Sequence, residues 1–236
     1  MIWAILLIAV FSSLVSSTVG FGGAMFFIPL ISLFIPLKNA IAISTIFYLS
    51  DCLVKVIIYR KLIDWKVTKL MLIGGIPFLV LGAFLMVSAP EVLLRRLLGI
   101  LVLIYVLNSI FKLTSKIKLS GFWIAAVSTL YGFFSGIIGT GGVIKAAVLH
   151  HIGLKKQKFV GTFAASALIF LIIKAIIFSK FSLVTSADIP LLIPLIIIGG
   201  IGPFIGRYLL RKLSSEFFRK LVIGALFVLS INLLFF

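Results

Sequence analysis

Long apolar runs separated by short basic clusters make up most of this 236-residue sequence. A helix needs about 20 predominantly apolar residues to cross a membrane. Six runs are long enough: 39–59, 70–89, 92–111, 159–179, 189–210 and 217–236. Only 11% of the residues are charged and the mean hydropathy is +1.36, which excludes an ordinary soluble domain. The sequence therefore predicts an all-α polytopic membrane protein.

The formal net charge of +17 does not indicate a nucleic-acid partner. The basic residues lie in short clusters between apolar runs, where they act as topology signals, and not along one face or tail. The uncharged start at Met1 lacks the features of a cleaved signal, so the first run is expected to stay in the membrane. The single cysteine, Cys52, forms no internal disulfide or zinc pattern. We expect a lipid bilayer as partner, no nucleic acid, no metal and no cofactor.

Two glycine-rich stretches interrupt the apolar sequence at equivalent places. Gly20-Phe21-Gly22-Gly23 follows the run 2–19, and Gly139-Thr140-Gly141-Gly142 follows the run 122–138. Each opens a second run, 24–36 or 143–153, that is too short to cross a membrane. Glycine at this density breaks a helix, and irregular backbone inside a membrane is tolerated only in protein or beside a wet cavity. We therefore predict two broken helical hairpins, 2–36 and 122–153, whose tips are candidate sites.

The two halves of the chain repeat each other. The segment Glu91–Gly99 matches Glu216–Gly224, and Ile73–Phe78 matches Ile198–Phe204 with one inserted glycine. Lys55 follows Gly20 at the same interval as Lys174 follows Gly139. The boundary is expected in the basic linker 112–120. The first repeat, 1–116, and the second, 117–236, would each hold one hairpin and three transmembrane helices.

The basic residues also predict a topology. If each hairpin returns to the side it entered, fifteen basic residues collect on one side and four on the other. The first group is Arg60, Lys61, Lys66, Lys69, Lys112, Lys116, Lys118, Lys155, Lys156, Lys158, Arg207, Arg211, Lys212, Arg219 and Lys220. The second is Lys38, Arg95, Arg96 and Lys180. Single crossings in place of the hairpins would leave a nearly even split. The positive-inside rule thus favours inverted repeats in the plasma membrane, with both termini extracytoplasmic.

Inverted hairpin tips would meet near the membrane midplane and form a site for a small anion. The half-helices start there, so their unpaired N–H groups and dipole ends converge. Lys145 lies about one turn into the second half-helix, and a lysine at that depth is expected to be functional. The expected substrate-binding residues are Gly20, Gly22, Gly23, Ser44, Thr45, Gly139, Thr140, Gly141, Gly142, Lys145, Thr162 and Ser166.

The roles of Lys55 and Lys174 stay open at this point. Each lies about five residues from a helix end, so it either snorkels to the interface or lines an electropositive entrance. Asp51, one turn before Lys55, is expected to pair with it. The membrane runs contain no other acid and no catalytic triad or paired carboxylates, so enzyme chemistry is not expected.

At these residues the chain resembles the sulfite exporter TauE/SafE family of membrane permeases. The resemblance rests on Gly20–Leu30, with Pro29 in its half-helix, on Ser135–Gly142, and on Val160-Gly161-Thr162, and it covers essentially the whole chain. Two positions depart from the family pattern: Ala147-Val148-Leu149 lacks a proline, and Ala42-Ile43-Ser44 replaces a glycine-threonine element. The resemblance implies transport, most commonly export, of small sulfur-containing anions such as sulfite or organosulfonates.

The sequence is thus interpreted as a secondary transporter of a small oxyanion, working by alternating access around a midplane site. An anion channel or passive uniporter would use the same site, and a non-transporting membrane scaffold would have packed, dry tips. Asp51 is the only acid available for proton coupling, whereas an interior-negative potential alone drives anions outward. Potential-driven export is therefore expected.

Overall fold

The computed structural model describes residues 2–19, 22–111, 121–154, 156–209 and 215–235. This part of the chain is helical, without strands. The α-helices are α1 (Ile2–Val19), α2 (Gly23–Ile31), α3 (Leu37–Tyr59), α4 (Trp65–Ser88), α5 (Glu91–Phe111), α6 (Gly121–Ile137), α7 (Gly142–His151), α8 (Lys156–Lys180), α9 (Ile189–Leu209) and α10 (Ser215–Phe235). Two short 3₁₀ helices, Arg60–Leu62 and Ser186–Asp188, precede α4 and α9.

The apolar runs predicted the helices closely, with two differences. Helix α4 begins at Trp65, five residues before the apolar run, because the Asp64 side chain caps it by accepting a hydrogen bond from the Val67 N–H. Helix α2 ends at Ile31, five residues before the run ends, and the Ser32 hydroxyl donates to the Pro29 carbonyl there. The apolar pattern alone does not predict these two helix ends, because local hydrogen bonds determine them.

Five helical segments within the described residues are long and apolar enough to cross a membrane: Leu37–Leu62, Trp65–Ser88, Glu91–Ser109, Gln157–Lys180 and Ser186–Ile205. The apolar helices Ile2–Ser17 and Gly121–Ile137 are shorter. These lengths confirm an all-helical, multi-pass membrane protein. The short helices α1 and α6 are each followed by a half-helix, α2 or α7, as the glycine breaks predicted.

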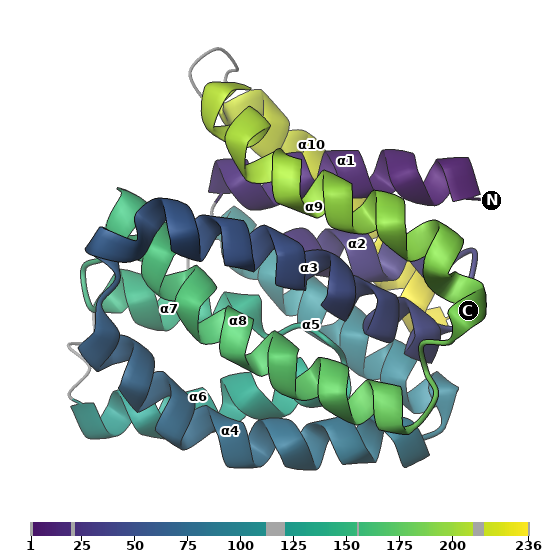
Figure 1. Ribbon diagram of the computed structural model, residues 1–236, viewed down its shortest axis with the longest axis horizontal. Coiled ribbons are helices and arrows are strands. Elements are labelled where there is room, and N and C mark those ends of the chain that lie inside the picture. Colours follow the sequence, from purple (N-terminus) through teal and green to yellow (C-terminus); the bar gives the residue numbers. More distant parts are fainter. Residues whose placement is uncertain (1, 20–21, 112–120, 155, 210–214, 236) are drawn as a thin grey trace.

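Helices from the two halves interleave. Helices α3 and α8 lie side by side through the middle of the molecule, α4 and α6 pair along one edge, and α1 and α9 pair along the opposite edge (Figure 1). In addition α3 contacts α9, α8 contacts α4, and α5 contacts α10. When each of α1 to α5 is exchanged with its counterpart among α6 to α10, the α4–α6 contact becomes α9–α1 and the α3–α9 contact becomes α8–α4. The α3–α8 and α5–α10 contacts map onto themselves. The packing therefore has the pattern expected of a pseudo-twofold relation between the halves.

Glycines allow α4 and α6 to approach very closely. A Cβ atom built on Gly132 would overlap the Gly75 backbone, and one on Gly136 would overlap the Leu79 carbonyl. Gly74, Gly75 and Gly199 lie at similarly close contacts. For Gly200, no described atom outside its own stretch of helix lies within 4 Å of the Cβ position. Small residues thus set the spacing of this helix pair, as is common in membrane interiors.

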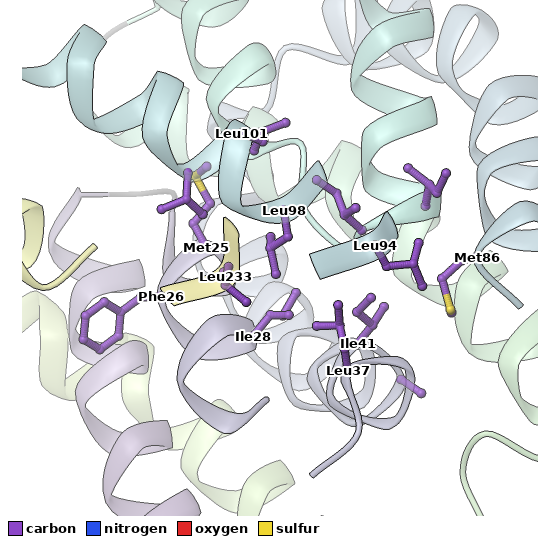
Figure 2. Packing of buried hydrophobic residues seen from close by; sticks show 14 of the residues in the cluster. Met25, Phe26, Ile28, Leu37, Ile41, Met86, Leu94, Leu98, Leu101 and Leu233 are labelled. Carbon is purple, nitrogen blue, oxygen red and sulfur yellow. The ribbon is translucent and has the colours of Figure 1, made fainter. Parts of the chain in front are cut away.

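The half-helix α2 is enclosed by protein. Its residues Met25, Phe26 and Ile28 belong to a buried apolar cluster that also includes side chains from α3, α4, α5 and α10 (Figure 2). Its other face, with Phe27 and Ile31, packs in a second cluster with α1, α3, α8 and α9. A helix of nine residues is only marginally stable alone, so this surrounding protein holds it in position.

Polar contacts gather at the two ends of α3. At its start, Glu91 accepts hydrogen bonds from the Leu37 N–H and from Arg95, and Lys38 donates to the Val87 carbonyl. Near its other end, Asp64 pairs with Lys158 at 3.2 Å. Burial of Asp64 disfavours its ionised form, but hydrogen bonds from Val67 and Lys158 outweigh this and lower its pKa. Lys38 and Arg95 of the smaller basic group therefore lie at one end of α3, and Lys158 of the larger group lies near the other end.

Candidate functional site

The two glycine-rich tips lie against each other in the interior. A Cβ atom built on Gly142 would lie 3.9 Å from the Gly22 backbone nitrogen. Gly22 and Gly139 have φ angles of 87° and 79°, which favour glycine and turn the chain sharply at each tip. Neither Gly22 nor Gly141 provides a side-chain cap for the half-helix that follows. Within the described residues, the first N–H groups of α2 and α7 therefore have no side-chain capping partner.

A cavity of about 70 Å³ lies between the tips. One water needs only about 10–15 Å³ by the same measure, so the cavity has room for a small polyatomic ion. Its walls come from α1, α2, α3, α6, α7 and α8, and they include both tips from Gly22 and from Gly139 onward. The structure thus brings most of the predicted residues together: Gly22, Gly23, Ser44, Asp51, Lys55, Gly139, Thr140, Gly141, Gly142, Lys145 and Lys174.

Lys145 is fully buried in this wall and is held by neutral groups. Its Nζ donates to the Tyr131 hydroxyl at 2.9 Å, the Phe163 carbonyl at 2.8 Å and the Ser166 hydroxyl at 3.2 Å. It also lies 3.9 Å from the centre of the Phe163 ring, a cation–π distance. None of the ion pairs among the described residues includes Lys145. Lys145 therefore has no carboxylate as a direct partner among the described residues.

Lys174 is equally buried, with 1% of its surface exposed, and has fewer partners. Its Nζ donates one hydrogen bond, to the Gly139 carbonyl at 3.1 Å, within the described residues. An ammonium group has three donors, so two remain for a ligand in the cavity. The sequence left open whether Lys174 snorkels to the interface or faces an interior path. In the structure its side chain is buried and lines the cavity.

Lys55 also lines the cavity and has the expected ion pair. Its Nζ lies 2.7 Å from Asp51 Oδ2, and Lys55 and Asp51 are 4% and 1% exposed. The Ser16 hydroxyl accepts from Lys55 at 2.7 Å and donates to Asp51 Oδ2 at 3.3 Å. Three ammonium groups and one carboxylate thus face the cavity, which leaves two positive charges if all four groups are ionised.

Four predicted residues are not part of the cavity wall as described. The Thr45 hydroxyl donates to the Ile41 carbonyl within its own helix. The Thr162 hydroxyl accepts from the Asp64 N–H near the end of α3, and Ser166 reaches the site only through Lys145. Gly20 lies outside the described residues.

Sequence reasoning missed several residues of the wall, notably Ser16, Tyr48 and Tyr131. Ser16 belongs to a group of four serines at 12, 13, 16 and 17 in a helix that is apolar before Ser12, and this was a visible signal of a polar interior. Tyr131 had no comparable signal, because its contact with Lys145 depends on how α6 packs beside α7.

A helical membrane protein with two broken helices and a cationic cavity between their ends belongs to the class of membrane transporters. The sequence profile of the sulfite exporter TauE/SafE family matches residues 5–233, nearly the whole chain. The protein therefore belongs to that family. No curated protein and no solved structure gives a significant match.

Proposed function

We propose that the protein is a secondary transporter that exports a small sulfur-containing oxyanion, such as sulfite or an organosulfonate, by alternating access. The observation that supports this most directly is the cavity where the α2 and α7 N-termini meet beside Lys55, Lys145 and Lys174. Helix N-termini bind anions through free N–H groups and a partial positive charge. Family membership supplies the sulfur chemistry, since N–H groups and ammonium groups recognise any small oxyanion.

The net charge of the site favours a divalent oxyanion. Two positive charges remain after the Asp51–Lys55 pair is counted, and a doubly charged anion would neutralise them. Burying an ion is costly unless its charge is compensated. An interior-negative potential then favours exit by about 2.3 kcal/mol per charge per 100 mV.

Flux from proteoliposomes tests this function. Liposomes that contain the protein should release labelled sulfite or methanesulfonate faster than protein-free liposomes, with saturation as the internal concentration rises. A negative lumen, set by a potassium gradient with valinomycin, should increase the rate. Acetate, which lacks three equivalent oxygens, should be released more slowly. Currents far above carrier turnover would instead favour a channel, and no flux for any anion would favour a scaffold.

Alternating access is supported by the relation between the halves. The six helix contacts compared under the overall fold keep their pattern when the halves are exchanged, and both half-helices begin at the cavity. In carriers built from inverted repeats, rocking of one group of helices against another exposes a midplane site to each side in turn. We propose that the repeats 1–116 and 117–236 are inverted and act in this way in the plasma membrane.

Cysteine labelling tests the topology. With Cys52→Ser as background, a cysteine introduced by Lys66→Cys should be protected from impermeant maleimide in sealed cells and labelled after permeabilisation. Lys38→Cys, at the opposite end of α3, should be labelled from outside. The reason is that the larger basic group, which includes Lys66, is expected to face the cytoplasm. Labelling of Lys66→Cys from outside would contradict the inverted arrangement.

A further inference from the structure

Asp51 differs from the other charged groups of the cavity because half of its carboxylate is unused. It is 1% exposed and lies in the cavity wall. Oδ2 accepts hydrogen bonds from Lys55 and Ser16, whereas Oδ1 has no hydrogen-bond partner among the described residues. A buried polar atom without a partner is rare in native proteins and calls for an explanation.

Lys55 has no donor to spare for a ligand. Its three N–H groups are directed to the Ser16 carbonyl at 3.3 Å, the Ser16 hydroxyl at 2.7 Å and Asp51 at 2.7 Å. An anion that binds Lys55 must therefore displace one of these acceptors. Asp51 is the one that carries negative charge, so repulsion from the anion acts on it specifically. Anion and carboxylate compete for the same ammonium group.

We propose that Asp51 takes up a proton when the anion binds, so that each anion is carried together with one proton. Once Lys55 turns to the anion, the carboxylate keeps only the Ser16 hydroxyl as a partner in a buried site. Protonation removes its charge, and the new O–H group donates a hydrogen bond where the ionised form would repel. The proton comes from water on the side to which the cavity is open.

The groups around Asp51 support this coupling. On its own helix lie Lys55, Tyr48 and Cys52, while Lys145 on α7, Lys174 on α8 and Tyr131 on α6 face the same cavity. Helix α1 contributes Ser16 and no ionisable group, and neither α2 nor the described side chains of α9 include one. In the empty site the three lysines favour ionised Asp51. A bound divalent anion offsets two of these three positive charges, so proton binding and anion binding strengthen each other reciprocally.

The second repeat shows that the fold does not require an acid here. Phe170 occupies the position equivalent to Asp51, at the same interval from the glycine-rich tip, and stacks on Tyr131 with ring centres 4.8 Å apart. Lys174, the equivalent of Lys55, bonds a backbone carbonyl and no carboxylate. The asymmetry makes Asp51 a proton site specific to the first repeat.

Infrared difference spectroscopy tests the proposal, which rests on the function proposed above. Spectra of the lipid-reconstituted protein with and without sulfite are compared at alkaline pH, where sulfite is a dianion. The wild type should gain the C=O stretch of a protonated carboxylic acid on adding sulfite. Asp51→Asn should lose this band, and Asp188→Asn, which removes a half-buried acid outside the cavity wall, should keep it.

Asp51→Asn leaves Lys55 without its counterion and can fail to fold. The double variant Asp51→Asn with Lys55→Gln removes both charges and should also lack the band. If sulfite is transported by the wild type but no acid band appears, or if the band persists in either Asp51 variant, the proton site is refuted while the transport function stands. If the wild type neither binds nor transports sulfite, both proposals fail.

Discussion

Lys174→Met should abolish most anion binding while leaving the fold intact. Lys174 is the cavity ammonium group with the most unused donors, since only the Gly139 carbonyl accepts from it among the described residues. A hydrogen bond to a charged group contributes about 1.5–3 kcal/mol. Its loss should weaken binding by roughly 10- to 150-fold. Methionine has a similar length and fills the same apolar space, so the cavity should not collapse.

The matched control is Lys180→Met, which removes the same charge from the exposed end of the same helix. Isothermal titration calorimetry of the purified proteins with sulfite compares the affinities of the two variants with that of the wild type. Equal affinities for Lys174→Met and Lys180→Met would mean that Lys174 only fixes the tip at Gly139.

The fold was largely predictable because its determinants are local. Apolar runs marked α3, α5 and α8 to within three residues at each end, since a lipid-exposed or buried helix needs continuous apolarity. The two glycine-rich stretches likewise predicted where both half-helices begin, because glycine at this density breaks a helix. The first turns of α4 were missed because Lys66 and Lys69 are polar, and the Asp64 cap outweighed apolarity there.

The site was predictable only in part because its chemistry is assembled by packing. Lys145 was identified from its depth, but its acceptors come from Tyr131 on α6 and from α8, 14 to 21 residues away. The positions of Lys55 and Lys174 in sequence allowed either a snorkelling or a cavity-facing side chain. Contact between α3 and α8 turns both lysines inward, and no local pattern encodes that contact.

Gly132→Ala should strongly destabilise the protein, because the added methyl group has no room. Its Cβ would overlap the carbonyl oxygen, carbonyl carbon and Cα of Gly75 on α4. These atoms are backbone, so no side-chain rotation relieves the contact and the two helices must move apart. Overpacking typically costs about 1–3 kcal/mol. We expect the upper end of that range, partly offset by the helix preference of alanine, worth up to about 1 kcal/mol.

Gly200→Ala is the matched control, because it makes the same change in the middle of another long helix. No described atom outside its own stretch of helix lies within 4 Å of the Gly200 Cβ position, so only the helix preference remains and stability should be unchanged or raised. Thermal unfolding of the detergent-solubilised variants measures the difference.

The effect of Gly132→Ala should extend to the site, because α6 carries Tyr131 and leads directly into the second tip. A shift of α6 away from α4 would move the hydroxyl that holds Lys145, so Gly132→Ala should also weaken sulfite binding. Unchanged stability and unchanged binding together would show that α4 and α6 have more freedom than their close contact implies.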